Sequence, residues 1–175
     1  MRYVVFVLLG VFGVILSGSF TTGIAIAGIQ VDLLLLIIVS IALLDKTSAP
    51  IIFAAAAGLF MDIMYSPVLG VYAISYSVAA ALVTLVFRNT ARFNFLMLLA
   101  SGAGAYLVKE LVMAATVYIL GSRFSLLGML VRYILPAAVL NGVLLLIAYL
   151  IFSKLYQTSW MKPKVRRVGD DFGHL

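Results

Sequence analysis

The stretch that decides the fold is residues 58–70, GLFMDIMYSPVLG, an apolar run that carries one acid and then meets a proline and a glycine. Gly58 and Asp62 are four residues apart, so on a helix they share one face. The small residue allows another backbone to come close, and the carboxylate then lies beside that contact. Pro67 and Gly70 predict a tight turn into the next apolar run. A charge in such a run is costly in lipid, so we expect Asp62 to face protein or water.

The composition of the whole chain indicates a polytopic membrane protein. Of its 175 residues, 65% are hydrophobic and only 10% are charged, and the mean hydropathy is +1.23. A soluble domain is about half apolar, with about a quarter of its residues charged. The apolar runs are long and do not alternate, which favours helices over a β-barrel. The chain has no cysteine, which excludes disulfides, thiolate metal sites and thiol nucleophiles.

The fold class predicted from these runs is an all-α membrane protein with six transmembrane helices. The expected spans are residues 3–20, 29–44, 50–64, 69–87, 94–120 and 133–152. A span needs roughly 20 apolar residues, so the second and third are short, which implies that they are tilted, re-entrant or packed inside the bundle. Five full spans plus a partial one is the alternative. We expect one six-helix domain at residues 1–158 and a basic, flexible cytoplasmic tail at 159–175.

The cations outside the spans predict the orientation. With the N-terminus inside, one side of the membrane carries nine cations: Arg2, Lys46, Arg88, Arg92, Lys154, Lys162, Lys164, Arg166 and Arg167. The other side carries Arg123 and Arg132. This bias follows the positive-inside rule, so both termini are expected in the cytoplasm and the span count is even. The net charge of +6 therefore indicates anchoring against anionic lipid rather than nucleic-acid binding.

Three aspartates lie at the ends of predicted helices. Asp32 precedes four leucines, and capping of that helix is favoured over a functional role. Asp45 closes the same helix and is expected in a solvated turn before Pro50. Asp62 lies at a helix C-terminal end, where a negative charge opposes the helix dipole. A partnered or functional Asp62 is therefore favoured over one that is simply hydrated at the outer interface.

Lys109 and Glu110 fall in the middle of the fifth apolar run. Adjacent helix residues point about 100° apart, so the two charges are not expected to cancel on one face. Each is expected to find a partner on another helix or to snorkel. A structural charge pair or a contact with a partner is favoured over a proton or substrate path.

Small residues precede this pair at four-residue spacing, Ala100 with Gly104 and Ser101 with Ala105. Such spacing lets helices approach closely. The fifth helix is therefore the predicted centre of the bundle. In the last span, Pro136 predicts a bend and Asn141 predicts an interhelical hydrogen bond.

Motifs for chemistry do not occur in the sequence. The only histidine, His174, lies in the tail, so no histidine-centred catalytic or metal site is expected. No glycine-rich loop with a phosphate-binding lysine is present. We expect no enzymatic activity, no cofactor and no metal.

The order of three short stretches resembles MreD, the integral-membrane rod shape-determining family of bacteria. They are DLLLL at 32–36, GLFMD at 58–62 continuing to Leu69-Gly70, and Leu135-Pro136 with Leu140-Asn141. The resemblance implies a non-enzymatic scaffold of the cell-elongation machinery in the bacterial inner membrane. It also implies association with the single-span protein MreC, with MreB filaments, and with RodA and its penicillin-binding transpeptidase partner. The basic run from Lys162 to Arg167 matches no motif of the family.

The resemblance further implies a fold similar to the six-helix substrate-binding subunits of energy-coupling-factor transporters. A small-molecule-binding subunit of such a transporter is the second functional hypothesis. A binding subunit should concentrate polar residues in its outer half, whereas the outer loops here are short and poor in hydrogen-bonding side chains. The scaffold is therefore favoured. The residues expected to contact a partner or pack helices are Asp32, Gly58, Asp62, Gly70, Lys109, Glu110, Pro136 and Asn141.

Overall fold

The computed structural model describes residues 2–23, 31–45, 47–87, 89–90, 93–121, 128 and 130–157, and these residues form an all-helical bundle. The predicted tail at 159–175 lies outside the described residues. The elements are α1 (Arg2–Gly23), α2 (Leu33–Leu44), α3 (Ala49–Tyr65), α4 (Val71–Phe87), α5 (Phe95–Ile119), the π-helical turn η1 (Leu130–Ile134) and α7 (Leu135–Gln157). Each predicted span thus corresponds to a helix.

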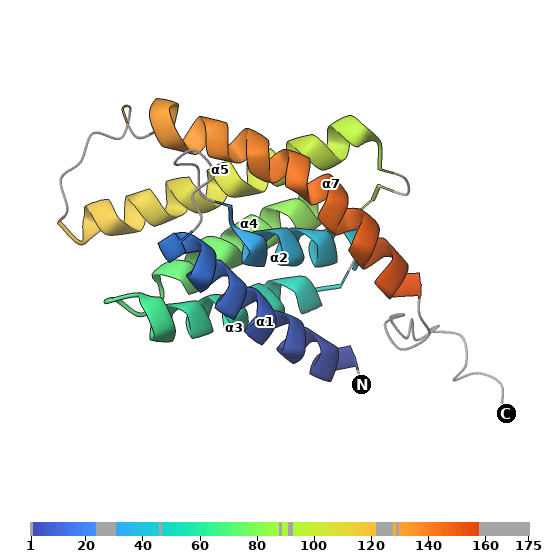
Figure 1. Cartoon of the computed structure of the whole chain (residues 1–175), viewed down its shortest axis with the longest axis horizontal. Coiled ribbons are helices and arrows are strands. Elements are labelled where there is room, and N and C mark those ends of the chain that lie inside the picture. The colour runs from blue at the N-terminus through green and yellow to red at the C-terminus, as the bar shows by residue number, and fades with distance from the viewer. Residues whose placement is uncertain are drawn as a thin grey trace, which may run out of the picture.

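The shortest α-helix of the described residues, α2, occupies the centre of the bundle (Figure 1). It contacts α1, α3, α4, α5 and α7, and every residue from Leu34 to Leu43 is buried. With 12 residues it is about 18 Å long, shorter than the roughly 30 Å of a bilayer core. The sequence prediction that α5 forms the centre is therefore wrong. A helix that is apolar on all sides is one that protein surrounds, and α2 fits that rule.

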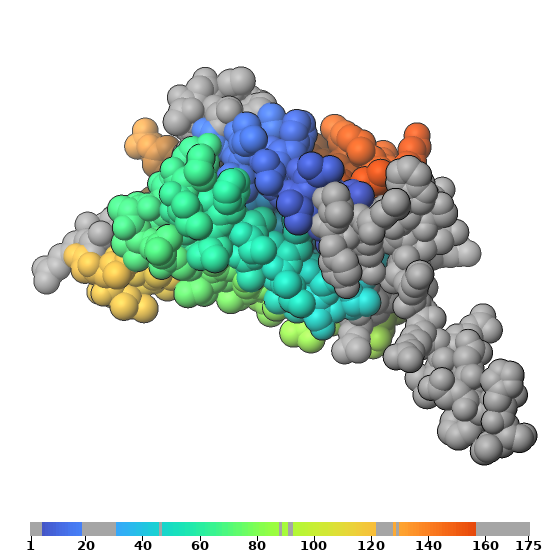
Figure 2. All heavy atoms as spheres, turned by 90° about the horizontal axis from the view of Figure 1, so that it is seen from below, coloured from blue at the N-terminus to red at the C-terminus, as the bar shows by residue number. Residues whose placement is uncertain are grey.

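Two helices are long and apolar enough to cross a membrane, Phe95–Ile119 and Leu130–Tyr156. The other apolar stretches of helix whose side chains the structure describes are shorter, at Val5–Gly18 within α1, Leu33–Leu44, Ala49–Tyr65 and Val71–Phe87. By length and composition alone, two helices of the described residues are candidates to span a membrane, and the count of six stays a prediction. Figure 2 shows α1 and α3 covering one face of the molecule.

Successive helices run in opposite directions, so their ends gather at two ends of the bundle (Figure 1). At one end α2, α4 and α7 begin while α1, α3 and α5 finish; we call it the α2-start end. The opposite end holds the beginning of α1 and the last turn of α7. Contacts between Ser17 and Leu34 and between Asp62 and Gly70 join neighbouring helices at the α2-start end.

The close packing of α5 against α7 depends on two glycines. A Cβ added at Gly102 would lie 2.9 Å from the Cα of Gly142, and one added at Gly142 would lie 2.8 Å from the carbonyl oxygen of Leu99. The predicted pair of Ala100 and Gly104 does not make this contact, because Ala100 is exposed and nothing lies within 4 Å of a Cβ at Gly104. Ser101 and Ala105, the second predicted pair, are buried.

Candidate functional site

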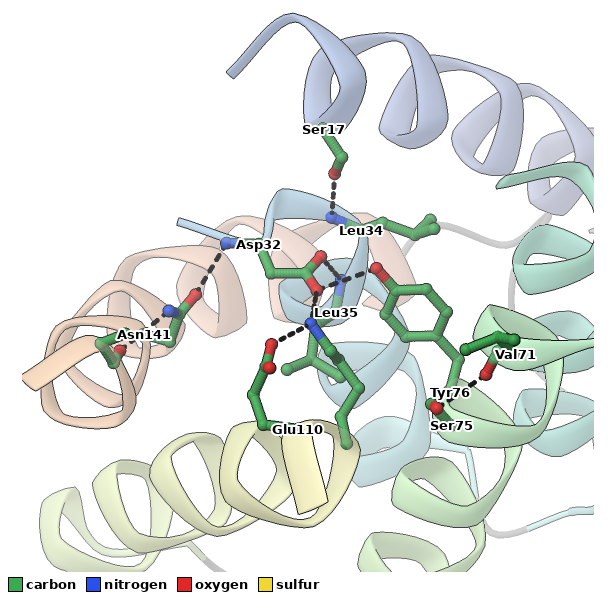
Figure 3. A network of polar contacts seen from close by, with 11 residues as sticks. Ser17, Asp32, Leu34, Leu35, Val71, Ser75, Tyr76, Glu110 and Asn141 are labelled. Carbon is green, nitrogen blue, oxygen red and sulfur yellow. Dashed lines mark hydrogen bonds and ion pairs between the residues drawn. The ribbon is translucent and has the colours of Figure 1, made fainter. Parts of the chain in front are cut away.

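A buried polar cluster lies at the α2-start end, and Asp32 is at its centre (Figure 3). One carboxylate oxygen, Oδ1, accepts a hydrogen bond from the backbone N–H of Leu35 at 2.9 Å. The other, Oδ2, accepts one from the Tyr76 hydroxyl at 2.8 Å and one from Lys109 Nζ at 3.1 Å. Asp32 therefore caps α2, as the sequence predicted, and also binds side chains of α4 and α5. Three donors thus bind the one carboxylate of Asp32.

Lys109 lies between two carboxylates and two aromatic rings. Its ammonium nitrogen is 3.1 Å from Oδ2 of Asp32 and 2.6 Å from Oε1 of Glu110. It also lies 5.1 Å from the ring centre of Tyr106 and 5.8 Å from that of Tyr76, within the range of cation–π attraction. The structural contact favoured from the sequence is present: Lys109 pairs with Glu110 and also reaches Asp32 of another helix, because the flexible lysine stem brings the ammonium to both acids.

The cluster carries more negative than positive charge. Asp32 and Glu110 supply two carboxylates and Lys109 supplies one ammonium, so the formal charge of the three is two negative less one positive, a single negative charge. Asp32 and Lys109 are nearly buried, with side chains 9% and 7% exposed, and the Glu110 side chain is 13% exposed. Glu110 is thus the charged member nearest the outside of the bundle.

Two further side chains bind backbone N–H groups where α2 begins. Asn141 of α7 accepts the N–H of Asp32 through Oδ1 at 3.0 Å, and its amide nitrogen donates to the carbonyl of Ala137 at 2.9 Å. Ser17 of α1 accepts the N–H of Leu34 at 2.9 Å. The first turn of a helix has N–H groups without acceptors inside the helix. For α2, side chains of α1 and α7 supply these acceptors. The interhelical hydrogen bond predicted for Asn141 is present.

Pro136 is the second residue of α7, and Leu135 separates it from the π-helical turn η1. A proline has no N–H to donate, so no backbone hydrogen bond runs from residue 136 back into η1. The change from π to α geometry occurs here, and such changes are common sites of bends. Pro136 lies outside the polar cluster, in the first turn after the change from η1 to α7.

Asp62 and Gly58 join α3 to the start of α4. The Asp62 carboxylate accepts three backbone N–H groups, from Gly70 and Ala73 through Oδ2 at 3.0 Å each and from Tyr72 through Oδ1 at 2.9 Å. A Cβ at Gly58 would lie 2.6 Å from the Cα of Ala73. The acid therefore caps the following helix, where the dipole favours a negative charge, and the glycine leaves room for it.

Gly70 completes this turn with a positive φ of 102°, a conformation that glycine adopts without strain. The partner sought for Asp62 is thus the backbone of its own chain, and Asp62 is fully buried. The site residues form two groups: Asp32, Lys109, Glu110 and Asn141 in the cluster, and Gly58, Asp62 and Gly70 in the α3–α4 turn.

Sequence analysis missed two participants and misplaced a third residue. Tyr76, with 1% of its surface exposed, and Ser17 were not among the predicted site residues. A phenol and a hydroxyl in apolar runs near the same end as Asp32 were the available signals. Asp45 is fully buried and accepts the backbone and side-chain donors of Thr47, so the predicted solvated turn is wrong.

The chemistry available to the cluster is charge pairing and hydrogen bonding. Among the described residues, no group of three or more histidine, aspartate and glutamate side chains is arranged to hold a metal ion. Asp32 and Lys109 hold each other and link α2, α4 and α5. Such a network specifies which helices meet and in which register.

The family to which the chain belongs is decided by its sequence along nearly the whole length. The family model of the rod shape-determining protein MreD matches residues 1–159. The chain belongs to the MreD family. No curated protein and no solved structure matches it significantly. The MreD match includes every residue of the polar cluster and of the α3–α4 turn, and it makes this a rod-shape-determining membrane protein. The likeness to energy-coupling-factor subunits stays a prediction.

Proposed function

We propose that this chain is a non-enzymatic integral-membrane scaffold of the bacterial cell-elongation machinery. In this role it binds an MreC-like single-span protein and so supports rod shape and peptidoglycan synthesis. The observation that carries the proposal is the MreD family match over residues 1–159. The polar cluster supports it, because its charged side chains bind one another across helices and so hold the bundle in one arrangement.

A scaffold in the membrane binds partners through its lipid-facing surface. Large apolar side chains are exposed on α1, α4, α5 and α7, including Leu8, Leu85, Leu111 and Val139. A single membrane helix would pack on such a surface by shape and by a few polar contacts, since lipid is as apolar as the side chains. MreB filaments on the cytoplasmic side, and RodA with its penicillin-binding transpeptidase, are the further proposed partners.

The proposed topology is multi-pass in the inner membrane, with six helices in the bilayer and both termini in the cytoplasm. The first residue of α1 and the last turn of α7 lie at one end of the bundle (Figure 1). In the sequence, the cations at 46, 88 and 92 adjoin helix ends on that side, and Lys154 is in the last turn of α7. This distribution follows the positive-inside rule. Because α2 is enclosed by other helices, its short length does not expose its ends to lipid.

The alternative function is a small-molecule-binding subunit of an energy-coupling-factor-type transporter. One observation favours it: Asp32, Tyr76, Lys109, Glu110 and Asn141 gather in one half of the bundle, where a binding subunit would hold its ligand. Against it, these side chains bind each other, and a ligand would have to replace strong charge-assisted bonds. The scaffold is therefore the better supported function.

Copurification separates the two functions. The tagged chain is expressed in its own bacterium and purified in mild detergent; one part is analysed for bound proteins and another, extracted with solvent, for small molecules. The scaffold predicts an MreC-like protein in stoichiometric amount and no enriched metabolite. An enriched metabolite with no single-span partner would support the transporter subunit and contradict the scaffold.

A further inference from the structure

The polar cluster holds two carboxylates, of Asp32 and Glu110, and only one ammonium, that of Lys109. Asp32 has three donors to its carboxylate, from Leu35, Tyr76 and Lys109. Glu110 shares the single ammonium of Lys109 with Asp32. It also forms a hydrogen bond with the side chain of Tyr106. A charge at membrane depth is costly, and ionisable groups there are usually paired. The charge count thus calls for one more cation, and Glu110, the most exposed of the three, is where that cation can reach.

The helix geometry places Glu110 where α5 and α7 meet. Ala103 packs against Gly142, with a Cβ on Gly142 only 3.3 Å from that of Ala103. Glu110 follows Ala103 by seven residues, and Leu135 precedes Gly142 by seven, so each lies on the contact face of its helix. Because the helices are antiparallel, Glu110 and Leu135 are at about the same depth. We call this line of Ala103, Glu110, Leu135 and Gly142 the α5–α7 seam.

The edge of this seam is open and apolar. The exposed fraction is 42% for Leu135 and 59% for Val139, one turn further along α7. In a bilayer this edge faces lipid, which offers no counter-charge to Glu110. A membrane helix lying along the edge would bury the apolar side chains and could bring a cation to the carboxylate.

We propose that the α5–α7 seam is the docking surface for the membrane helix of the partner, and that an Arg or Lys of this helix pairs with Glu110. The inference rests on the proposed scaffold function and names the surface that function uses. The cationic side chain would bring the charge of the cluster to zero. It would also fix the rotation and depth of the partner helix, since a charge pair in lipid specifies position more sharply than apolar contacts do.

Single-cysteine crosslinking tests the surface in the unaltered charge background. The chain has no cysteine of its own, so each variant carries one cysteine and every disulfide crosslink to the partner comes from that position. Leu135→Cys and Val139→Cys report on the edge of the seam. Ile52→Cys on α3 and Leu85→Cys on α4 are controls on other helices, and both side chains are more exposed than those at the edge. Each is coexpressed with the MreC-like protein of the same bacterium, which carries one cysteine moved stepwise along its membrane helix. After oxidation in membranes, crosslinks should form at the two seam positions and not at the two controls.

Neutralisation tests the charge pair. Glu110→Gln keeps the shape of the side chain and removes its charge, and it should lower copurification of the partner by about tenfold. Neutralising the partner's Arg or Lys should give the same loss, and the two changes together should lose little more than either alone. The thermal melting of the purified Glu110→Gln chain shows that it is folded.

Each outcome bears on one proposal or both. If the unaltered chain retains no MreC-like protein, the scaffold function fails and this inference falls with it. If the partner copurifies but crosslinks at Ile52→Cys or Leu85→Cys, the scaffold stands and the seam is overturned. Unchanged copurification of Glu110→Gln, or a partner helix with no Arg or Lys in reach of the seam, overturns the charge pair.

Discussion

At the scale of single residues, Asp32 and Asp62 both cap the start of a helix, but from different positions in the chain. Asp32 caps the helix that it precedes, and Asp62 caps a helix that begins nine residues after it. Both satisfy first-turn N–H groups and place negative charge at a helix N-terminus, where the dipole favours it. The position of Asp62 at the end of α3, unfavourable when α3 is viewed alone, is favourable once α4 is in place.

Asp62→Ala should destabilise the protein without preventing its insertion. The substitution leaves three N–H groups at the start of α4 without their acceptor, and the expected loss in free energy of unfolding is about 2 kcal/mol. Thermal melting of the purified protein measures it, and the amount in the membrane is the control. Weaker capture of the MreC-like partner should follow from the loosened turn. Melting equal to that of the parent would show that the cap contributes nothing.

Lys109→Met should be among the most damaging single substitutions. It leaves Asp32 and Glu110 buried without a counter-charge, which costs about 3–5 kcal/mol. The double variant Lys109→Met, Glu110→Leu should recover part of this loss, because one of the two unpaired charges is gone. A double-mutant cycle on unfolding measures the coupling, with the exposed Lys154→Met as the control. If the single variants melt like the parent while cells lose their shape, the cluster is functional rather than structural.

At the scale of helices, packing explains why α2 can be short and why α5 and α7 lie so close. A buried 12-residue helix needs only to match its neighbours, and its N-terminal N–H groups are bound by Ser17 and Asn141. Gly102 and Gly142 let the backbones of α5 and α7 touch. Without a hydrophobic driving force in lipid, such close contact is a main source of helix association.

Two glycines of α5 provide a matched test of this packing. Gly102→Ala puts a Cβ 2.9 Å from the Cα of Gly142, whereas Gly104→Ala puts one into open space. The first should destabilise the protein by about 1–3 kcal/mol through overpacking. The second should be neutral or slightly stabilising, since alanine is the better helix former by about 1 kcal/mol. Thermal melting of the two purified variants checks this, and the reverse order would contradict the α5–α7 packing described here.

The helices were easier to predict than the contacts between them. Long apolar runs fix where helices form, and Pro67 and Gly70 mark the turn before α4. Sequence spacing also identified the face shared by Gly58 and Asp62. It could not rank Gly102 above Gly104, because which small residue meets another helix depends on how that helix is rotated. Likewise, Lys109 binds Asp32, which lies 77 residues away in the sequence. No local sequence pattern relates these two residues.

At the scale of the whole molecule, the bundle has two unlike ends. The cluster and the α3–α4 turn lie at the α2-start end, and the beginning of α1 and the last turn of α7 lie at the other (Figure 1). Reporter fusions after residue 20, Ser66 and Ser122 should report the outside. Fusions after Lys46, Asn89 and Leu175 should report the cytoplasm. A C-terminus on the outside would contradict the topology.

The central claim is that this chain supports rod shape as a scaffold, and cell shape measures it most directly. The gene is placed under a repressible promoter in its own bacterium, and the length-to-width ratio of the cells is followed after repression. The account predicts that rods become round, that a plasmid copy of the unaltered chain restores them, and that Lys109→Met does not. Cells that keep their rod shape after the protein is gone would contradict the account.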